Sequence, residues 1–157
     1  KELRADALIN AVRAQNYQKA RELVQIKGVN VDGHTSGENT PLTDAAMRGD
    51  VCGTKFLIEE LNANPFASCD CPNHKTAWHY ASENGHVKVL EVLNSTSKNE
   101  YGARDVNIFD NRSYTPYDLA INEDVRKYLA SIGGKPASQV SKSNTKQLTP
   151  PNTLYLM

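Results

Sequence analysis

The segment TPLTDAAMRGD (Thr40–Asp50) decides the fold, because close copies of it recur along the chain. It returns as TAWHYASENGH (Thr76–His86) and begins again as TPYDLAINEDV (Thr115–Val125), and a fainter copy, DALINAVRAQN (Asp6–Asn16), precedes all three. The Thr-led copies start 36 and 39 residues apart. Repetition at such a period predicts stacked units, each too small to bury its own apolar face.

Each copy indicates a helix, a turn and a second helix. Thr40 suits the N-cap of a helix, and Pro41 suits the first helical position, where an N–H would be unpaired anyway. Gly49 supplies the left-handed residue of the turn. Phe56 and Leu57 then mark an apolar second helix, and a polar loop leads to the next Thr. The pattern therefore predicts an all-α fold of helical pairs with projecting loops.

Together these motifs resemble the ankyrin repeat, whose unit reads roughly T-P-L-H-x-A-A-x-x-G-H before an apolar second helix. The likeness covers about residues 3–132, and it departs from the pattern at Thr43, Ala77 and Trp78. It implies an ankyrin-type helix-turn-helix solenoid of about four repeats, the first degenerate and the last shortened. The repeats fall at residues 4–34, 35–67, 68–108 and 109–132, so we expect one repeat domain over 1–132 and a flexible tail over 133–157.

Differences between the copies mark where the surface varies. The third unit carries extra residues within Asn94–Tyr101 (NSTSKNEY), which we expect to lengthen the loop after its second helix. Such an insertion either takes part in recognition or is a surface insertion that the fold tolerates, and the sequence leaves both interpretations open. Trp78 occupies an inward position of its helix, so we expect it in the core rather than in a binding surface.

The overall composition argues against some classes of protein. The 18 basic and 18 acidic residues balance, so we predict neither nucleic-acid binding nor attachment to a charged membrane. No apolar run approaches the ~20 residues of a membrane span. Three cysteines without framework spacing fit a reducing compartment, so we expect an intracellular protein, cytoplasmic or nuclear. The chain begins at Lys1 without a signal peptide, and we interpret it as a piece of a longer protein.

The cysteines and histidines have either a chemical or a structural role. Cys69-x-Cys71-x-x-His74, with His79 beyond, has the residue types of a zinc site, but Cys-x-Cys is a poor clamp. A Cys–His nucleophile needs a closed cleft, which a helical stack does not obviously supply. His79 and His86 instead match positions where the ankyrin unit usually has histidine. We therefore predict no catalytic residues, no metal, no cofactor and no enzymatic activity.

The resemblance implies a concave groove, lined by the first helices and the loop tips, where partners dock. When the groove positions of the ankyrin repeat are transferred to this sequence, they give the following candidate partner-binding residues: Arg13, Asp44, Met47, Arg48, Asn73, His74, Tyr80, Glu83, Asn84, Asn111, Arg112 and Tyr114. Tyr, Met and Arg are residue types that anchor protein interfaces.

The resulting hypothesis is a non-enzymatic protein-interaction module, monomeric in isolation, within a larger regulatory or scaffold protein. It would bind a peptide or a folded partner. One alternative is a structural spacer that packs against another domain of the same chain. Metal binding and nucleic-acid binding are the others, although Asp44 and Glu83 interrupt the basic and aromatic face that nucleic acid would need.

Overall fold

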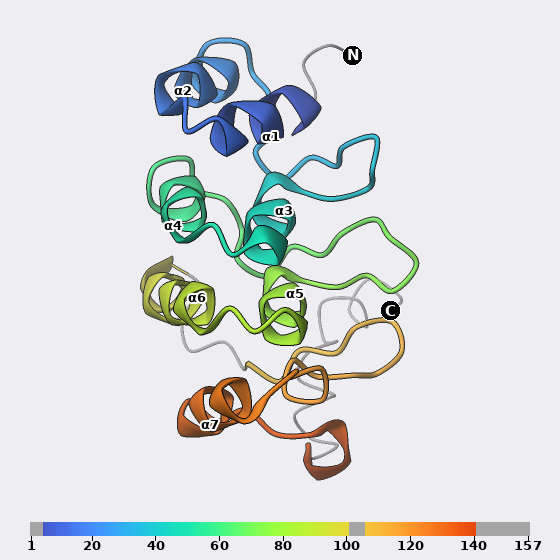
Figure 1. Ribbon diagram of the computed structural model, residues 1–157. Coiled ribbons are helices and arrows are strands. Elements are labelled where there is room, and N and C mark those ends of the chain that lie inside the picture. The colour runs from blue at the N-terminus through green and yellow to red at the C-terminus, as the bar shows by residue number, and fades with distance from the viewer. Residues whose placement is uncertain (1–4, 101–105, 141–157) are drawn as a thin grey trace.

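Consecutive pairs of helices stack on one another in the computed structural model, which describes residues 5–100 and 106–140 (Figure 1). An isolated bridge between Ser68 and Thr76 is the β-structure found within these residues, and the all-α prediction is confirmed. The helices are α1 (Ala5–Arg13), α2 (Tyr17–Gln25), α3 (Pro41–Arg48), α4 (Val51–Glu59), α5 (Ala77–Glu83), α6 (Val87–Glu100) and α7 (Glu123–Ser131), followed by the short 3-10 helix η1 (Ala137–Gln139).

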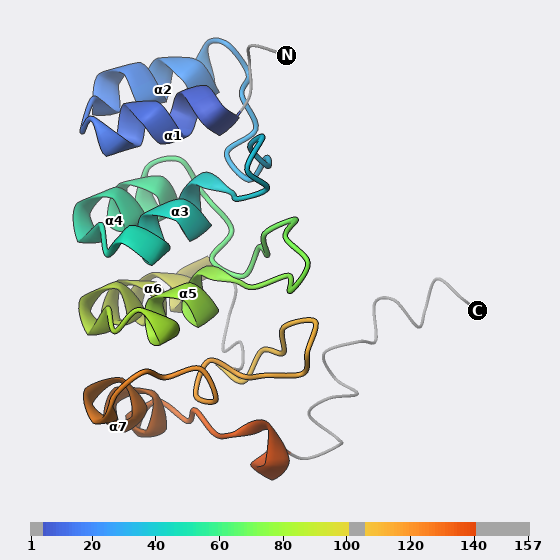
Figure 2. The ribbon, with the colours of Figure 1, turned by 45° about the vertical axis from the view of Figure 1, so that its right-hand side comes forward.

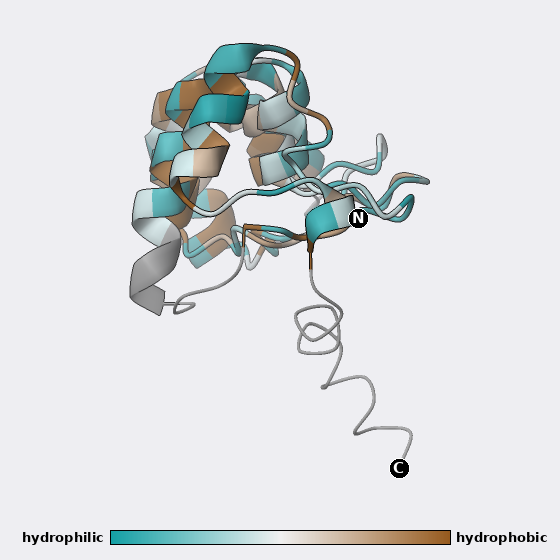
Figure 3. Cartoon of the chain, turned by 90° about the horizontal axis from the view of Figure 1, so that it is seen from below, coloured by the Kyte–Doolittle hydropathy of each residue, from teal (hydrophilic) through white to brown (hydrophobic). Residues whose placement is uncertain are grey.

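Two layers of helices enclose the core. Helices α1, α3 and α5 form one layer, and α2, α4, α6 and α7 form the other (Figure 1). The loops between pairs extend sideways from the first layer (Figure 2), and a view along the stack shows them projecting in the same direction (Figure 3). Trp78 is 2% exposed and therefore lies in the core as predicted. The layers bury large apolar side chains between them: Leu8, Leu42, Leu57, Leu90, Leu93 and Leu129.

A threonine begins three of the units in the same way. The backbone N–H of each threonine donates to the side chain three residues later: Thr40 to Thr43, Thr76 to His79 and Thr115 to Asp118. The N–H groups of Thr43 and Asp118 donate in return to the hydroxyls of Thr40 and Thr115. All three threonines are buried. The residue three places after the threonine is free to vary because a hydroxyl, an imidazole and a carboxylate can each accept that hydrogen bond.

The turns inside the first three units use one backbone conformation. Gly49 and Gly85 lie at φ 75° and 77°, and Gln15 takes the equivalent place in the first unit at φ 58°. A left-handed conformation suits glycine but strains a residue with a side chain. The first unit thus keeps the shape of the turn without the glycine.

The insertion of the third unit was predicted as loop, and the structure corrects this. Helix α6 runs from Val87 to Glu100, so residues 94–100 extend the helix instead of the loop. No Gly or Pro interrupts that stretch, and the Ser95 and Thr96 hydroxyls donate to the Val92 carbonyl within it. The rest of the insertion, Tyr101, lies outside the described residues.

The fourth unit also departs from prediction, because its Thr-led segment forms turns in place of a helix. Leu119 N–H donates to the Pro116 carbonyl at 3.1 Å, and Ala120 N–H donates to the Tyr117 carbonyl at 3.2 Å. The N-cap of α7, Asn122, follows Thr115 more closely than Asp50, the N-cap of α4, follows Thr40. A full helix and its turn do not fit in the shorter span. Tyr117 and Ala120 still pack against the core.

The segment after α7 contacts the last unit. Asn107 Nδ2 donates to the Gly133 carbonyl at 3.0 Å and Thr115 Oγ1 donates to the Lys135 carbonyl at 2.7 Å, while Lys135 N–H donates to Asn107 Oδ1 at 2.7 Å. The predicted tail starts at Gly133, and three of its residues bond to the last unit: Gly133, Lys135 and Ala137. The rest of that tail, 141–157, lies outside the described residues.

Candidate partner-binding surface

Three predicted residues form one ion-pair cluster across α1 and α3. Arg13 donates to both carboxylate oxygens of Asp44, at 2.6 and 3.2 Å, and Arg48 Nε donates to Asp44 Oδ2 at 2.9 Å. The Asp44 side chain is 6% exposed, against 52% for Arg13 and 32% for Arg48. The carboxylate therefore lies beneath two guanidinium groups that face solvent. The hydrogen bond and charge of Asp44 raise the pKa of Arg13 above its ordinary value.

Tyr80 lies at the centre of a second cluster on α5. Lys75 Nζ sits 5.4 Å from the centre of the Tyr80 ring and pairs with Glu83 at 2.6 Å. The Tyr80 hydroxyl lies 3.3 Å from Cys71 Sγ and 3.5 Å from Cys69 Sγ. Burial, and then the Glu83 carboxylate, raise the pKa of Tyr80. Asn84 donates from Nδ2 to the Tyr80 carbonyl at 2.9 Å, which anchors this predicted residue to the end of its own helix.

A third cluster occupies the loop before Thr115. The guanidinium carbon of Arg112 lies 4.9 Å from the centre of the Tyr114 ring, and Tyr114 is 42% exposed. Asp110 Oδ1 accepts from the N–H groups of Arg112 and Tyr114, both at 2.9 Å, and Arg112 Nη2 lies 3.5 Å from Asp110 Oδ2. The Asp110 side chain is fully buried while that of Arg112 is 46% exposed. As in the first cluster, a carboxylate lies beneath an exposed arginine.

Successive loops are bonded to one another. Asn111 N–H donates to the Asn73 carbonyl at 2.7 Å, and Asn111 Nδ2 donates to the Pro72 carbonyl at 3.1 Å. One loop earlier, Asp70 N–H donates to the Glu38 carbonyl at 2.7 Å. Asn73 and Asn111 thus link the loops, and the predicted residue His74 is exposed beside them with φ 50°.

His79 on α5 and His86, the residue before α6, hold neighbouring units together. His86 Nε2 lies 3.1 Å from the Met47 carbonyl. The backbone of Met47, a predicted partner-binding residue, therefore already contacts the next unit of the stack. His79 Nδ1 lies 3.2 Å from Thr76 N and its Nε2 lies 2.9 Å from the Tyr114 carbonyl. Burial lowers the pKa of His79, although the hydrogen bond to Tyr114 and the charge of Asp110 oppose that shift. A neutral ring satisfies both contacts, with Nδ1 as acceptor and Nε2–H as donor.

Cys69, Cys71, His74 and His79 have the residue types of a zinc site but do not gather into one. Both ring nitrogens of His79 lie within hydrogen-bonding distance of backbone atoms, and the Cys69 and Cys71 sulfurs both lie near the Tyr80 hydroxyl. In the part of the chain that the structure describes, no three His, Cys, Asp or Glu side chains gather as they would around a metal ion.

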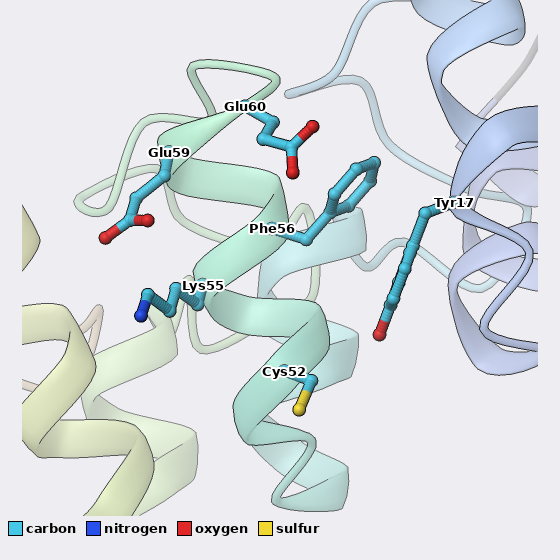
Figure 4. Close-up of a pocket in the computed structure, with 6 residues that line it drawn as sticks. All are labelled: Tyr17, Cys52, Lys55, Phe56, Glu59 and Glu60. Carbon is cyan, nitrogen blue, oxygen red and sulfur yellow. The ribbon is translucent and has the colours of Figure 1, made fainter.

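A pocket on the outer layer lies between α2 and α4 and has a volume of about 240 Å³ (Figure 4). The Tyr17 and Phe56 rings stack across it with centroids 4.5 Å apart, and Arg21 lies 5.4 Å from the centre of the Phe56 ring. The remaining lining residues are Cys52, Lys55, Glu59 and Glu60. None of these residues was predicted as a partner-binding residue, and Phe56 was predicted only as an apolar residue of a second helix.

The molecule is thus a helical repeat protein that displays side chains on its inner helices and loop tips. The sequence profile of ankyrin repeats matches residues 8–105 in three copies, and the chain therefore belongs to the ankyrin-repeat family. The fourth unit lies beyond this match. Proteins of the family are generally protein-interaction modules and are typically not enzymes.

No curated protein sequence matches the chain significantly. None of the helices within the described residues is both long and apolar enough to cross a membrane.

Proposed function

We propose that the inner helices and loop tips bind a protein or peptide partner, as part of a larger regulatory or scaffold protein. The observation that carries the proposal is that buried carboxylates on this face are paired with arginines that reach the solvent. Asp44 and Asp110 are buried, whereas the arginines paired with them, Arg13, Arg48 and Arg112, are between 32% and 52% exposed. The surface thus presents guanidinium groups that buried carboxylates hold in place, and the Tyr114 ring is exposed beside Arg112.

Fixed arginines suit recognition because little side-chain entropy remains to be lost when a partner binds. Arginine and tyrosine are also the residue types that dominate measured binding energy at protein interfaces. The proposed binding surface consists of the predicted residues Arg13, Asp44, Met47, Arg48, Asn73, His74, Tyr80, Glu83, Asn84, Asn111, Arg112 and Tyr114. Within it, Asp44 and Asn111 position their neighbours, and the exposed arginines and tyrosines make the contacts.

Affinity capture followed by binding measurements with the purified partner tests the proposal. We expect Arg48→Ala/Tyr80→Ala and Arg112→Ala/Tyr114→Ala each to weaken binding at least tenfold, about 1.4 kcal/mol, while melting changes little. The control variant, Lys55→Ala/Glu59→Ala, removes exposed side chains of the outer helix α4 and should bind normally. Unchanged binding by both groove variants would show that the partner uses another surface.

The alternative of a spacer that packs against the rest of a longer chain uses the outer layer instead. The pocket between α2 and α4 and the exposed Ile26, 76% accessible at the end of α2, support that candidate. Under the alternative, the Lys55→Ala/Glu59→Ala variant loses binding to the adjoining domain and the two groove variants retain it. The same set of variants therefore separates the two functions.

A further inference from the structure

Arg13 and Arg48 of the inner face are paired differently from Arg21 of the outer layer. Arg21 bonds to Glu60, and the two side chains are similarly exposed, at 42% and 49%. Arg13 and Arg48 both bond to Asp44, whose side chain is 6% exposed. An anion that approaches Arg21 therefore meets a carboxylate at the same surface, whereas one that approaches Arg13 and Arg48 meets guanidinium groups first.

The two inner arginines share one carboxylate. They reach it from the neighbouring helices α1 and α3 (Figure 1), and both Nε atoms bond to Asp44 Oδ2, at 3.2 and 2.9 Å. Two positive charges thus face one buried negative charge. Asp50 lies 3.6 Å from Arg48 Nη2, but it also caps α4 and accepts from the Gly53 N–H at 2.8 Å, where the positive end of the helix dipole offsets part of its charge. The cluster therefore keeps positive charge on its solvent side.

Hydrogen-bond donors of both arginines remain for a ligand. A guanidinium group carries five N–H bonds and no acceptor. Arg13 uses Nε and Nη2 on Asp44, and Arg48 uses Nε. Among the residues that the structure describes, neither Nη1 group has a hydrogen-bond partner, and the two side chains are 52% and 32% exposed. A ligand at this place must therefore supply acceptors, and the charge of the cluster favours an anion.

The charge favours a carboxylate over a phosphate. A side-chain carboxylate has one charge and two acceptor oxygens, which suit two neighbouring guanidinium edges. A phosphate group carries about 1.5 to 2 negative charges, so Asp44 and Asp50 would repel it more strongly. The tail of this chain cannot supply the carboxylate from a side chain, because residues 133–157 contain three lysines and no acidic residue.

We propose that the binding surface recognises an acidic segment of its partner, with one aspartate or glutamate carboxylate bound across Arg13 and Arg48. This inference rests on the proposed function and specifies the chemistry of the partner. Asp44 positions both arginines and does not touch the ligand. Because the guanidinium groups are held before the partner arrives, the carboxylate gains charge-assisted hydrogen bonds with little further loss of side-chain entropy.

Peptide titrations followed by NMR test the inference. The probes are a short glutamate-rich peptide and its glutamine counterpart of the same length, added to the whole chain. At low salt we expect the glutamate peptide to bind about fivefold more tightly or better, with saturable shifts of the Nε–Hε signals of Arg13 and Arg48. This comparison uses the parent protein and needs no variant.

Two variants assign the preference to the cluster. Arg13→Gln/Asp44→Asn/Arg48→Gln should abolish the preference for the glutamate peptide, and Asp44→Asn is included so that no buried carboxylate is left unpaired. The control Arg21→Gln removes an exposed arginine of the outer layer and should keep the preference. Circular dichroism checks that both variants fold.

Equal binding of the two peptides by the parent, or an unchanged preference in the triple variant, would overturn the inference. Tighter binding of a phosphoserine counterpart at the same arginines would overturn the choice of a carboxylate. The proposed function is judged separately, by the captured partner. If the groove variants lose that partner while the parent shows no preference for glutamate, the surface stands and its partner has another chemistry. If the preference is present and the groove variants keep the partner, the arginine site stands and the proposed function fails.

Discussion

At the residue scale, two glycines of one conformation differ in what surrounds them. Gly49 and Gly85 lie at φ 75° and 77°, but a Cβ on Gly49 would come within 2.7 Å of the His86 ring, whereas one on Gly85 meets nothing nearer than 3.4 Å. The backbone strain of replacing either glycine is therefore similar, about 1–2 kcal/mol. Only at Gly49 does a clash add to it, and there it also disturbs the bond between His86 and the Met47 carbonyl.

We predict that Gly49→Ala lowers the free energy of unfolding by about 2–4 kcal/mol and Gly85→Ala by about 1–2 kcal/mol. Urea denaturation of the two variants and the parent measures both changes. Adding His86→Ala to Gly49→Ala should bring back the part of the loss that comes from the clash. Equal losses in the two glycine variants would mean that the His86 ring moves aside freely.

His79 gives the stability of the protein a pH dependence. Its folded pKa is lowered, chiefly by burial, so the unfolded chain binds a proton at a higher pH than the folded protein does. Above the ordinary pKa of about 6.5 both states are neutral, and no stability is lost. As the pH falls below that value, the unfolded state gains the proton first, and the free energy of unfolding drops by up to about 1.4 kcal/mol per pH unit.

We expect thermal melts between pH 7 and pH 5 to show this fall, and His79→Gln to flatten the profile because glutamine cannot take up the proton. The other histidines are present in both proteins, so the difference between the two profiles belongs to His79. Parallel profiles for the parent and the variant would contradict a buried neutral ring at this position.

At the scale of the elements, the hairpin of α1 and α2 contains the one inner turn without glycine among the first three units. Gln15 occupies the left-handed position there with φ 58°. Replacement by glycine removes roughly 1–2 kcal/mol of strain but frees the unfolded chain by about 0.5–1 kcal/mol. We therefore predict that Gln15→Gly raises the free energy of unfolding by about 0.5–1 kcal/mol.

The neighbouring variant Ala14→Gly serves as the control for this prediction. Ala14 is not among the residues with positive φ, so glycine there should destabilise by about 0.5–1 kcal/mol. Urea titrations of both variants give the two signs directly. A loss of stability in Gln15→Gly would mean that the glutamine side chain contributes more than the strain of its backbone.

Elements that follow from local sequence could be predicted, and elements set by the length of a connection could not. Thr40-Pro41 and Gly49 contain both signals that bound α3, so its limits follow from the sequence. The stretch 94–100 was misjudged because its polar composition suggested loop, although it contains no residue that ends a helix. The Thr115 segment carries every signal of a helix start, but the short distance to Asn122 leaves no room for the helix.

The candidate surface could be predicted only as a set of positions. The resemblance selects Arg13, Asp44 and Arg48 because they lie after the inward-facing pair that begins with leucine and before the turn of their units. It does not say that Asp44 would lie beneath both arginines, since that depends on how closely α1 and α3 approach. The same holds for Tyr80, whose contacts with Cys69 and Cys71 arise from the folded path of a loop rather than from any sequence spacing.

At the scale of the whole molecule, the stack needs a closed lower end. The last unit lacks its first helix, and Gly133, Lys135 and Ala137 bond to that unit instead. Thr115 and Asn107 are buried and bond to Lys135 and Gly133, and Asp118 Oδ2 accepts from the Ala137 N–H at 3.1 Å. Irregular terminal units commonly cap repeat arrays in this way, because an exposed end would otherwise leave core residues facing water.

We predict that a chain ending at Ile132 is less stable than one ending at Val140 by about 2–4 kcal/mol, because several hydrogen bonds, most of them partly buried, are lost together. Urea denaturation of the two chains measures the difference, and Asn107→Ala in the longer chain should reproduce part of it. Because α7 is the helix nearest the cut, hydrogen exchange in the shorter chain should rise most between Glu123 and Ser131. Identical midpoints for the two chains would place the end of the folded domain at residue 132, as the repeat pattern alone predicts, and would make the contacts of 133–140 incidental to folding.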